Sequence, residues 1–184
     1  MIKTPALLPK PKKLRSKPGS FRLREGTPIV LSSGSEDSDF VSAWALRQAI
    51  AAETNVLLPV ETHAQFQGIG PRIELARSRA DGQGYRIHVR ANRIELVGQG
   101  PAGLRYGVET LSQIFQPRSR TVMACDVEDA PDLEWRGLLL DVSRGKVPTL
   151  ETLKQVVDLM VGLKLNLLML YTEHVFRFRR HPLI

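Results

Sequence analysis

The sequence predicts an α+β domain, in which two helices cover an antiparallel sheet, followed by the first βαβ unit of a truncated TIM barrel. Several segments before residue 98 alternate apolar and polar side chains, as strands with one covered face do. Two segments with helical spacing supply that cover. From Glu134 onward, near-continuous apolar runs indicate strands buried on both faces. We expect an extended basic arm (1–20), the α+β domain (21–128) and the start of the (β/α)8 barrel (129–184).

The elements of the first domain follow from local patterns. Strands are expected at Phe21–Arg24, Pro28–Leu31, Val56–Val60, Arg72–Leu75, Tyr85–Arg90, Arg93–Val97 and Thr121–Asp126. A helix over Asp39–Glu53, capped by Ser38 and Asp39, is expected to bury Val41, Trp44, Ala45, Ala49 and Ala52. A second helix over Ala102–Phe115 presents the apolar stripe Leu104, Val108, Leu111 and Phe115.

The last part of the chain has a different character. Leu138–Leu140 and Leu165–Tyr171 are predicted to be parallel strands, joined by a helix that begins after Thr149 as its cap. Only 51 residues run from Glu134 to the end, whereas a closed barrel takes roughly 250 residues. We therefore expect a fragment without catalysis of its own, prone to self-association through the incomplete barrel.

Composition limits the classes of function. The chain has 184 residues, 42% hydrophobic and 24% charged, which is typical of a globular protein. Its net charge of +7 is concentrated at the N-terminus, because residues 1–24 hold eight Lys or Arg and no acid, which leaves 18 basic and 19 acidic residues elsewhere. The basic arm lacks interleaved aromatic residues, so a solvated arm is favoured over nucleic-acid binding.

No cofactor or metal is expected. Cys125 is the single cysteine, which excludes an internal disulfide and fits a reducing compartment. The four histidines show no ligand spacing, and no nucleophile–His–acid arrangement can be assembled. The N-terminus has no apolar core of signal-peptide length and no run is long enough to span a bilayer, so we expect a cytoplasmic protein without a membrane partner.

The segment Gly98-Gln-Gly100-Pro-Ala-Gly103 matches a dinucleotide-binding fingerprint, and Asp126 follows at about the distance of a ribose contact. However, the preceding strand alternates polar and apolar residues, whereas the first strand of a dinucleotide fold is buried throughout. Pro101 also removes a backbone N–H from the helix start. Glycines that pack a helix tightly on the sheet are favoured over a nucleotide site.

Polar residues at the ends of the predicted barrel strands are the candidate site. Asp141, Ser143 and Arg144 follow the first strand and Glu173 follows the second, at the barrel end where active sites are built. Position alone favours an Asp–Arg pair that caps a loop. Arg136 begins the first strand, so only a side chain rising through the barrel interior could reach a ligand.

Several motifs resemble those of family-20 glycoside hydrolases, the β-N-acetylhexosaminidases. Arg136-Gly-Leu-Leu-Leu-Asp-Val-Ser-Arg144 and Lys164-Leu-Asn-Leu-Leu168 resemble the opening of that family's catalytic barrel. Leu8-Pro-Lys-Pro11, Gly84-Tyr-Arg-Ile87 and Ala102-Gly-Leu-Arg-Tyr-Gly-Val-Glu-Thr-Leu111 look like its small, zincin-like α+β domain. The resemblance spans nearly the whole chain.

The resemblance implies release of terminal N-acetylglucosamine or N-acetylgalactosamine from glycans, with retention and with the substrate's acetamido group as nucleophile. The family's catalytic Asp-Glu pair lies on a fourth barrel strand, so we expect no catalytic residue in this chain. By motif matching, Arg136 corresponds to an arginine that holds sugar hydroxyls, Glu173 falls where many members have an aspartate, and Asp141 and Arg144 match structural positions.

Thr-Glu-His from Thr172 departs from the commonest family pattern at the end of the second strand. That departure keeps open the alternative that the chain is the N-terminal part of a related acetamido-sugar or uronic-acid hydrolase. A separate alternative is a non-catalytic carbohydrate-binding or scaffold module that contains this domain.

Overall fold

The computed structural model describes residues 6–115, 117–173 and 178–181. The chain divides into two compact units, Met1–Asp132 and Leu133–Ile184. The elements of the first unit are β1 (Lys13–Arg22), β2 (Ile29–Leu31), α1 (Asp37–Thr54), β3 (Val60–Thr62), β4 (Arg72–Ser78), β5 (Tyr85–Val89), β6 (Arg93–Gln99), α2 (Gly100–Ile114) and β7 (Thr121–Asp129). Those of the second are β8 (Gly137–Asp141), α3 (Leu150–Gly162) and β9 (Leu167–Tyr171).

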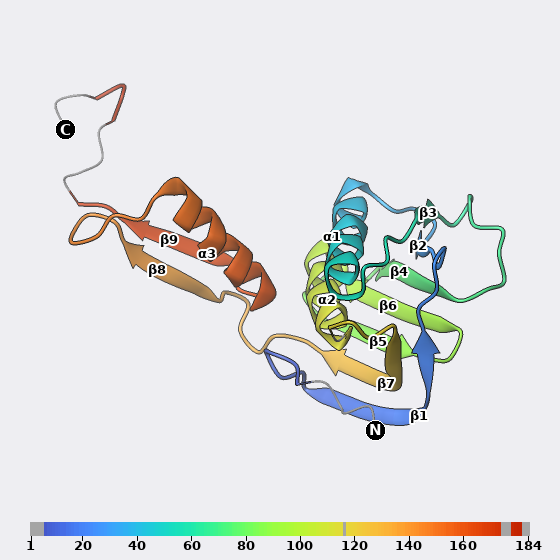
Figure 1. Cartoon of the computed structure of the whole chain (residues 1–184). Coiled ribbons are helices and arrows are strands. Elements are labelled where there is room, and N and C mark those ends of the chain that lie inside the picture. Colours follow the sequence, from blue (N-terminus) through green and yellow to red (C-terminus); the bar gives the residue numbers. More distant parts are fainter. Residues whose placement is uncertain (1–5, 116, 174–177, 182–184) are drawn as a thin grey trace. The chain divides into compact units, whose positions relative to one another are not determined.

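The first unit is a seven-stranded sheet in the order β1-β7-β5-β6-β4-β2-β3, with α1 and α2 on one face (Figure 1). The α+β class is confirmed, but the predicted antiparallel sheet is wrong in part. Strands β2, β3, β4 and β6 pair in parallel, whereas β5 pairs antiparallel with β6 and β7, and β1 with β7. Side-chain alternation has the same period in both pairings, so it reports the covered face and not the strand direction.

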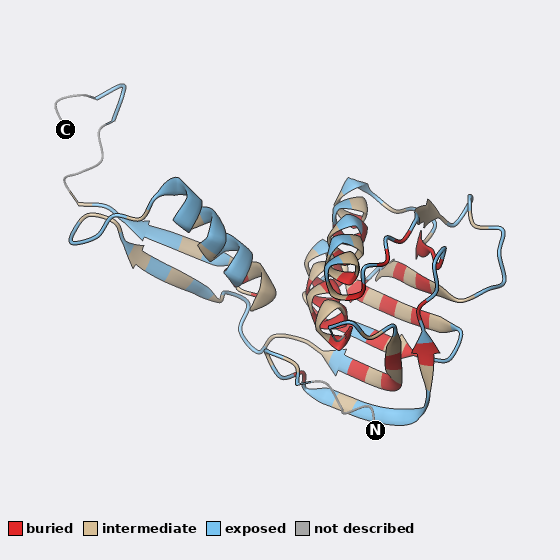
Figure 2. Ribbon diagram, in the orientation of Figure 1, coloured by how far each residue is buried: buried red, intermediate tan, exposed pale blue. Residues whose placement is uncertain are grey.

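The core of the first unit lies between the sheet and the two helices. The red stripes of Figure 2 mark the inward positions of the strands, which alternate with polar residues facing away from the helices. The predicted stripe of α2 is confirmed, since Leu104, Val108, Leu111 and Phe115 are all buried. This sheet face therefore supplies the hydrophobic stabilisation of the unit.

The orientation predicted for α1 is wrong. Val41 and Trp44 are 62% and 49% exposed, whereas Leu46 and Ile50 are fully buried. Apolar residues occur around the whole circumference of α1, so spacing alone could not fix which side faces the sheet. The start of the helix differs as well, since α1 begins at Asp37 with Glu36 as its N-cap, and Ser38 lies inside the helix. Of the two predicted capping residues, Asp39 takes part, because its carboxylate accepts a hydrogen bond from the Glu36 N–H at 2.8 Å.

Two predicted strands also differ in place. The predicted strand Val56–Val60 is largely loop, and β3 begins only at Val60. The segment expected to be an extended basic arm contributes β1 from Lys13, which pairs with β7 from Lys13↔Glu128 to Arg22↔Thr121 and has an irregularity between Ser16 and Ser20. This pairing joins residues that are 99 to 115 positions apart in the chain, and no local pattern reports such a contact.

On the polar face of the sheet, Asp126 of β7 contacts basic side chains from two neighbouring segments, β1 and the end of β5. Its carboxylate lies 2.8 Å from His88 Nδ1, 2.5 Å from Arg90 Nη2 and 3.5 Å from Lys17 Nζ. Burial opposes ionisation, but the hydrogen bonds from His88 and Arg90 outweigh it and lower the pKa of Asp126 to about 2. The ionised carboxylate therefore stabilises the folded state.

We expect Asp126→Asn to remove an acid-sensitive part of the stability. The folded pKa lies below the unfolded value of about 3.9, so the contribution is complete above that pH and is lost as pH falls toward 2. Urea unfolding of the variant and of the parent chain should differ most at pH 7 and converge between pH 4 and 2. If the free energies of unfolding of the two proteins differed by the same amount at pH 7 and at pH 2, the Asp126 carboxylate would not be the source of the acid-sensitive stability.

The second unit is a β8-α3-β9 arrangement whose two parallel strands pair from Gly137↔Leu167 to Asp141↔Tyr171. Thr149 caps α3 as predicted, since its Oγ1 accepts a hydrogen bond from the Thr152 N–H at 3.1 Å. Leu139 and Met169 are 61% and 50% exposed, so strands with apolar side chains on both faces lie largely uncovered (Figure 2). Within the described part of the chain, no helix combines the length and hydrophobicity of a membrane span.

Candidate functional site

Polar side chains gather at the carboxyl ends of β8 and β9. Because the strands are parallel and in register, Asp141 and Tyr171 end side by side, and the loops after them bring Arg144 to Glu173. The guanidinium of Arg144 forms an ion pair with both carboxylate oxygens of Glu173, one from Nε at 3.2 Å and a shorter one from Nη2. This pair fixes the two loops with respect to each other.

Asp141 and Tyr171 complete this cluster. The Asp141 carboxylate accepts hydrogen bonds from the N–H and hydroxyl of Ser143 at 2.8 and 2.6 Å, which lower the pKa of Asp141. The Tyr171 hydroxyl donates to Glu173 Oε1 at 3.0 Å, and this bond raises the pKa of Tyr171. Asp141 thus caps its loop, while Arg144 pairs with Glu173 instead of with Asp141.

Arg136 lies at the opposite end of this two-stranded sheet. Its guanidinium donates to the Lys164 carbonyl from Nε at 3.0 Å and from Nη2 at 2.8 Å, and to the Leu133 and Glu134 carbonyls from Nη1 at 2.5 and 3.1 Å. Asn166 assists, since its amide accepts from the Arg136 N–H at 2.8 Å and donates to the Glu134 carbonyl at 2.7 Å. These contacts tie together the amino ends of β8 and β9.

The structure therefore brings Asp141, Arg144 and Glu173 together and places Arg136 about five residues of strand away, roughly 16 Å. Sequence reasoning missed Tyr171 and Asn166 as partners of the candidate residues. Tyr171 could have been found, because it directly precedes the Thr-Glu-His segment at the strand end. His174 of that segment lies outside the described residues.

The glycine-rich segment packs a helix and does not form a phosphate cradle. A Cβ at Gly98 would lie 2.1 Å from the Leu104 nitrogen, and one at Gly103 would lie 2.3 Å from the Gly84 carbonyl oxygen. The glycines thus let α2 approach β6 and the start of β5 closely. Asp126, which has the spacing of a ribose contact in that fingerprint, lies on the sheet face opposite α2 and is contacted by His88 and Arg90.

The remaining reactive side chains that the structure describes do not gather into a site. Burial raises the pKa of the Cys125 thiol to about 11, so the thiol stays protonated and unreactive at neutral pH. Among residues 6–115, 117–173 and 178–181, no three His, Cys, Asp or Glu side chains gather as metal ligands would.

The chain combines an α+β unit with a βαβ unit that has polar residues at its strand ends. The same fold occurs in solved structures of β-N-acetylhexosaminidases. The fold matches a β-N-acetylhexosaminidase of Streptomyces coelicolor A3(2) with a TM-score of 0.74, at 25% identity, over 90% of this chain and 34% of that protein. It also matches a variant Streptomyces plicatus β-hexosaminidase, solved in complex with its product GlcNAc, with a TM-score of 0.73 at 24% identity, over 90% of this chain and 34% of that one.

Sequence comparison gives the family. Residues 4–130 match the family model described as glycosyl hydrolase family 20, domain 2. A β-N-acetylhexosaminidase of Cellulomonas fimi is 31% identical over 96% of this chain, which spans 36% of that relative's length. The chain belongs to glycosyl hydrolase family 20 and contains its domain 2, the α+β domain of the β-hexosaminidases.

Proposed function

We propose that this chain is the N-terminal portion of a glycoside hydrolase that releases terminal N-acetylglucosamine or N-acetylgalactosamine from glycans by a retaining, substrate-assisted mechanism. The single observation that carries the proposal is the family membership, which extends through domain 2 and, in the Cellulomonas fimi relative, over 96% of the chain. The product complex of the Streptomyces plicatus relative supports the choice of an N-acetylhexosamine.

The exposed apolar strands of the second unit support the part of the proposal that assigns this unit to a catalytic barrel. Strands with apolar side chains on both faces are typical of a parallel sheet that is covered on both sides. Leu139 and Met169 are half exposed or more, and the α3 residues Leu150 and Leu159 are 70% and 60% exposed. We infer that β8, α3 and β9 form the first βαβ unit of a (β/α)8 barrel whose other strands cover these residues, and self-association through them stays a prediction.

The residues of this chain then have supporting roles. Arg144 and Tyr171 hold Glu173 at the carboxyl end of β9. We propose that Glu173 binds substrate hydroxyls, because barrel enzymes build their active sites at that end of the strands. Asp141 fixes the first loop of that end through Ser143. The general acid is assigned to a fourth barrel strand, which the two-stranded β8–β9 sheet does not include.

The test is hydrolysis of chromogenic β-N-acetylglucosaminide and β-N-acetylgalactosaminide by the full-length protein that contains this chain. We expect turnover by that protein, with the β-anomer as first product by NMR, and none by the 184-residue chain. The matching β-glucoside, which lacks the acetamido group, should be hydrolysed at least about a thousandfold more slowly, because the nucleophile is missing. Comparable rates on both substrates, or turnover by the chain alone, would refute the proposal.

A further inference from the structure

The sheet face opposite α1 and α2 carries an excess of positive charge over β1, β7 and β5. Five cations lie on it. Lys13 and Arg15 pair in register with Glu128 and Asp126, and Arg86 pairs with Glu128. Lys17 and Arg90 both contact the Asp126 carboxylate. The carboxylates among them are Asp126 and Glu128, both on β7. We call these seven residues the cationic sheet face, and its formal charge at neutral pH is five minus two, or +3.

Each carboxylate of this face is shared among several cations. Asp126 is contacted by Lys17, His88 and Arg90. Glu128 forms an ion pair with Lys13 at 2.9 Å, and the nearby charges of Arg86 and Arg15 add to the lowering of its pKa. Among the residues that the structure describes, no ion pair to Arg15 or Arg86 is found, so their guanidinium groups keep donors for a ligand.

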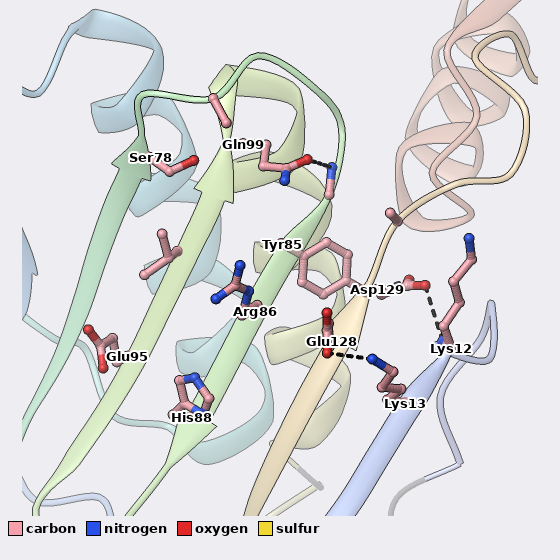
Figure 3. Close-up of a pocket in the computed structure, with 14 residues that line it drawn as sticks. Lys12, Lys13, Ser78, Tyr85, Arg86, His88, Glu95, Gln99, Glu128 and Asp129 are labelled. Carbon is pink, nitrogen blue, oxygen red and sulfur yellow. Dashed lines mark hydrogen bonds and ion pairs between the residues drawn. The ribbon is translucent and has the colours of Figure 1, made fainter.

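A pocket of about 490 Å³ opens on this face, a volume in the range of small-ligand sites. Figure 3 shows the Arg86, His88 and Glu95 side chains lying over the strands of the pocket, with Lys13 bound to Glu128 at its side. Glu95 is neutralised by Arg93 at 2.9 Å. The wall thus holds three cations, Lys12, Lys13 and Arg86, and three carboxylates, Glu95, Glu128 and Asp129. Arg86 lies opposite Glu128 in the register but forms no ion pair among the described residues, so its guanidinium keeps donors for an anion. The carboxylate oxygens and the Gln99 amide oxygen can accept hydrogen bonds from hydroxyls.

We propose that the cationic sheet face binds an acidic glycan, with Arg86 and Arg15 taking its carboxylate or sulfate groups and the pocket taking the hydroxyls of one sugar unit. Arginine suits this task because its planar fork matches both anions with two parallel hydrogen bonds. The choice of a glycan rests on the proposed function, whereas the choice of an anion rests on the charge of the face.

Nucleic acid fits this face less well. Sheet surfaces that bind single strands stack bases on exposed aromatic side chains. The Tyr85 ring of the pocket wall is 3% exposed, and its hydroxyl lies 2.6 Å from Thr110 Oγ1. The His88 ring is 41% exposed but is held by Asp126 at 2.8 Å. The described residues of the pocket wall therefore present no exposed Phe, Tyr or Trp ring for stacking, and their groups recognise charge and hydroxyls.

The experiment measures binding of fluorescent oligosaccharides to the 184-residue chain by anisotropy at about 50 and 150 mM salt. The probes are a heparin hexasaccharide for sulfate, a hexagalacturonate for carboxylate, neutral chitohexaose, and a DNA duplex of charge equal to that of the heparin probe. Arg86→Gln and Arg86→Lys are compared with Arg105→Gln, which removes the same charge from α2, where Arg105 pairs with Glu109.

We expect at least one acidic glycan to bind more tightly than chitohexaose and DNA, with an affinity that falls as salt rises. Arg86→Gln should weaken binding about tenfold, Arg86→Lys by less, and Arg105→Gln by under about twofold. Equal affinities for Arg86→Gln and Arg105→Gln, equal binding of chitohexaose, or DNA binding as tight as that of the glycan would overturn the inference. Because hydrolysis is not measured, these outcomes are separate from the test of the proposed function.

Discussion

The Gly98→Ala variant should lose about 3 kcal/mol or more of its free energy of unfolding. The added Cβ would lie 2.1 Å from the Leu104 nitrogen, 2.3 Å from the Leu104 Cα and 2.6 Å from the Gly103 carbonyl carbon. All three atoms are backbone, so no rotamer change relieves the overlap. Helix α2 would have to move off the sheet and take Leu104, Val108 and Leu111 with it, although all three are buried in the core.

The measurement is urea unfolding followed by the fluorescence of Trp44, which lies on α1 in the first unit. A Trp135→Phe background makes Trp44 the single tryptophan of the chain, so the signal reports the first unit alone. Gly70→Ala is the matched control, because a Cβ there meets no atom within 4 Å, and its stability should change by less than about 0.5 kcal/mol. The same unfolding midpoint for both variants would show that α2 does not depend on the close approach.

The second large effect is expected at Arg136. Motif matching assigns Arg136 to the hydroxyls of the terminal sugar. On that proposal, Arg136→Ala in the full-length protein should lower kcat/KM by about a hundredfold to a thousandfold, because a charged hydrogen-bond donor to the substrate would be lost. In this structure the guanidinium binds the carbonyls of Leu133, Glu134 and Lys164. The variant could therefore also loosen the amino ends of β8 and β9, and the experiment has to separate the two effects.

Deoxy analogues of the substrate make that separation. If Arg136 holds a hydroxyl, the wild-type enzyme discriminates against the 3-deoxy or 4-deoxy sugar, and the Arg136→Ala enzyme loses most of that discrimination. Arg136→Lys keeps the positive charge but loses the planar guanidinium with its paired donors. Its discrimination against the deoxy sugars should lie between those of the wild type and Arg136→Ala. Arg105→Ala, on the surface of α2, should leave kcat/KM within about twofold. Unchanged discrimination in Arg136→Ala, with a lower melting temperature, would assign Arg136 a structural role alone.

Much of the candidate site could be placed from the sequence, but its pairings could not. The polar residues after Leu140 and after Leu170 were predicted to share one strand end, and the parallel register of β8 and β9 places them there. Their partners depend on loop conformation, however. The expected pair of Asp141 and Arg144 gives way to Asp141 with Ser143 and Arg144 with Glu173, because the loop after β8 turns the arginine toward β9.

The sequence by itself determined the α+β class, the covered face of most strands, the stripe of α2 and the family resemblance. The first three follow from local alternation and spacing, which report how a residue is buried relative to its neighbours in the chain. The resemblance rests on matching motifs. The tertiary structure decided the direction of β2, β3, β4 and β6, the rotation of α1, the pairing of β1 with β7 and the cationic sheet face. Those features depend on contacts between residues far apart in the chain, such as Lys13 with Glu128, whose energies no local pattern contains.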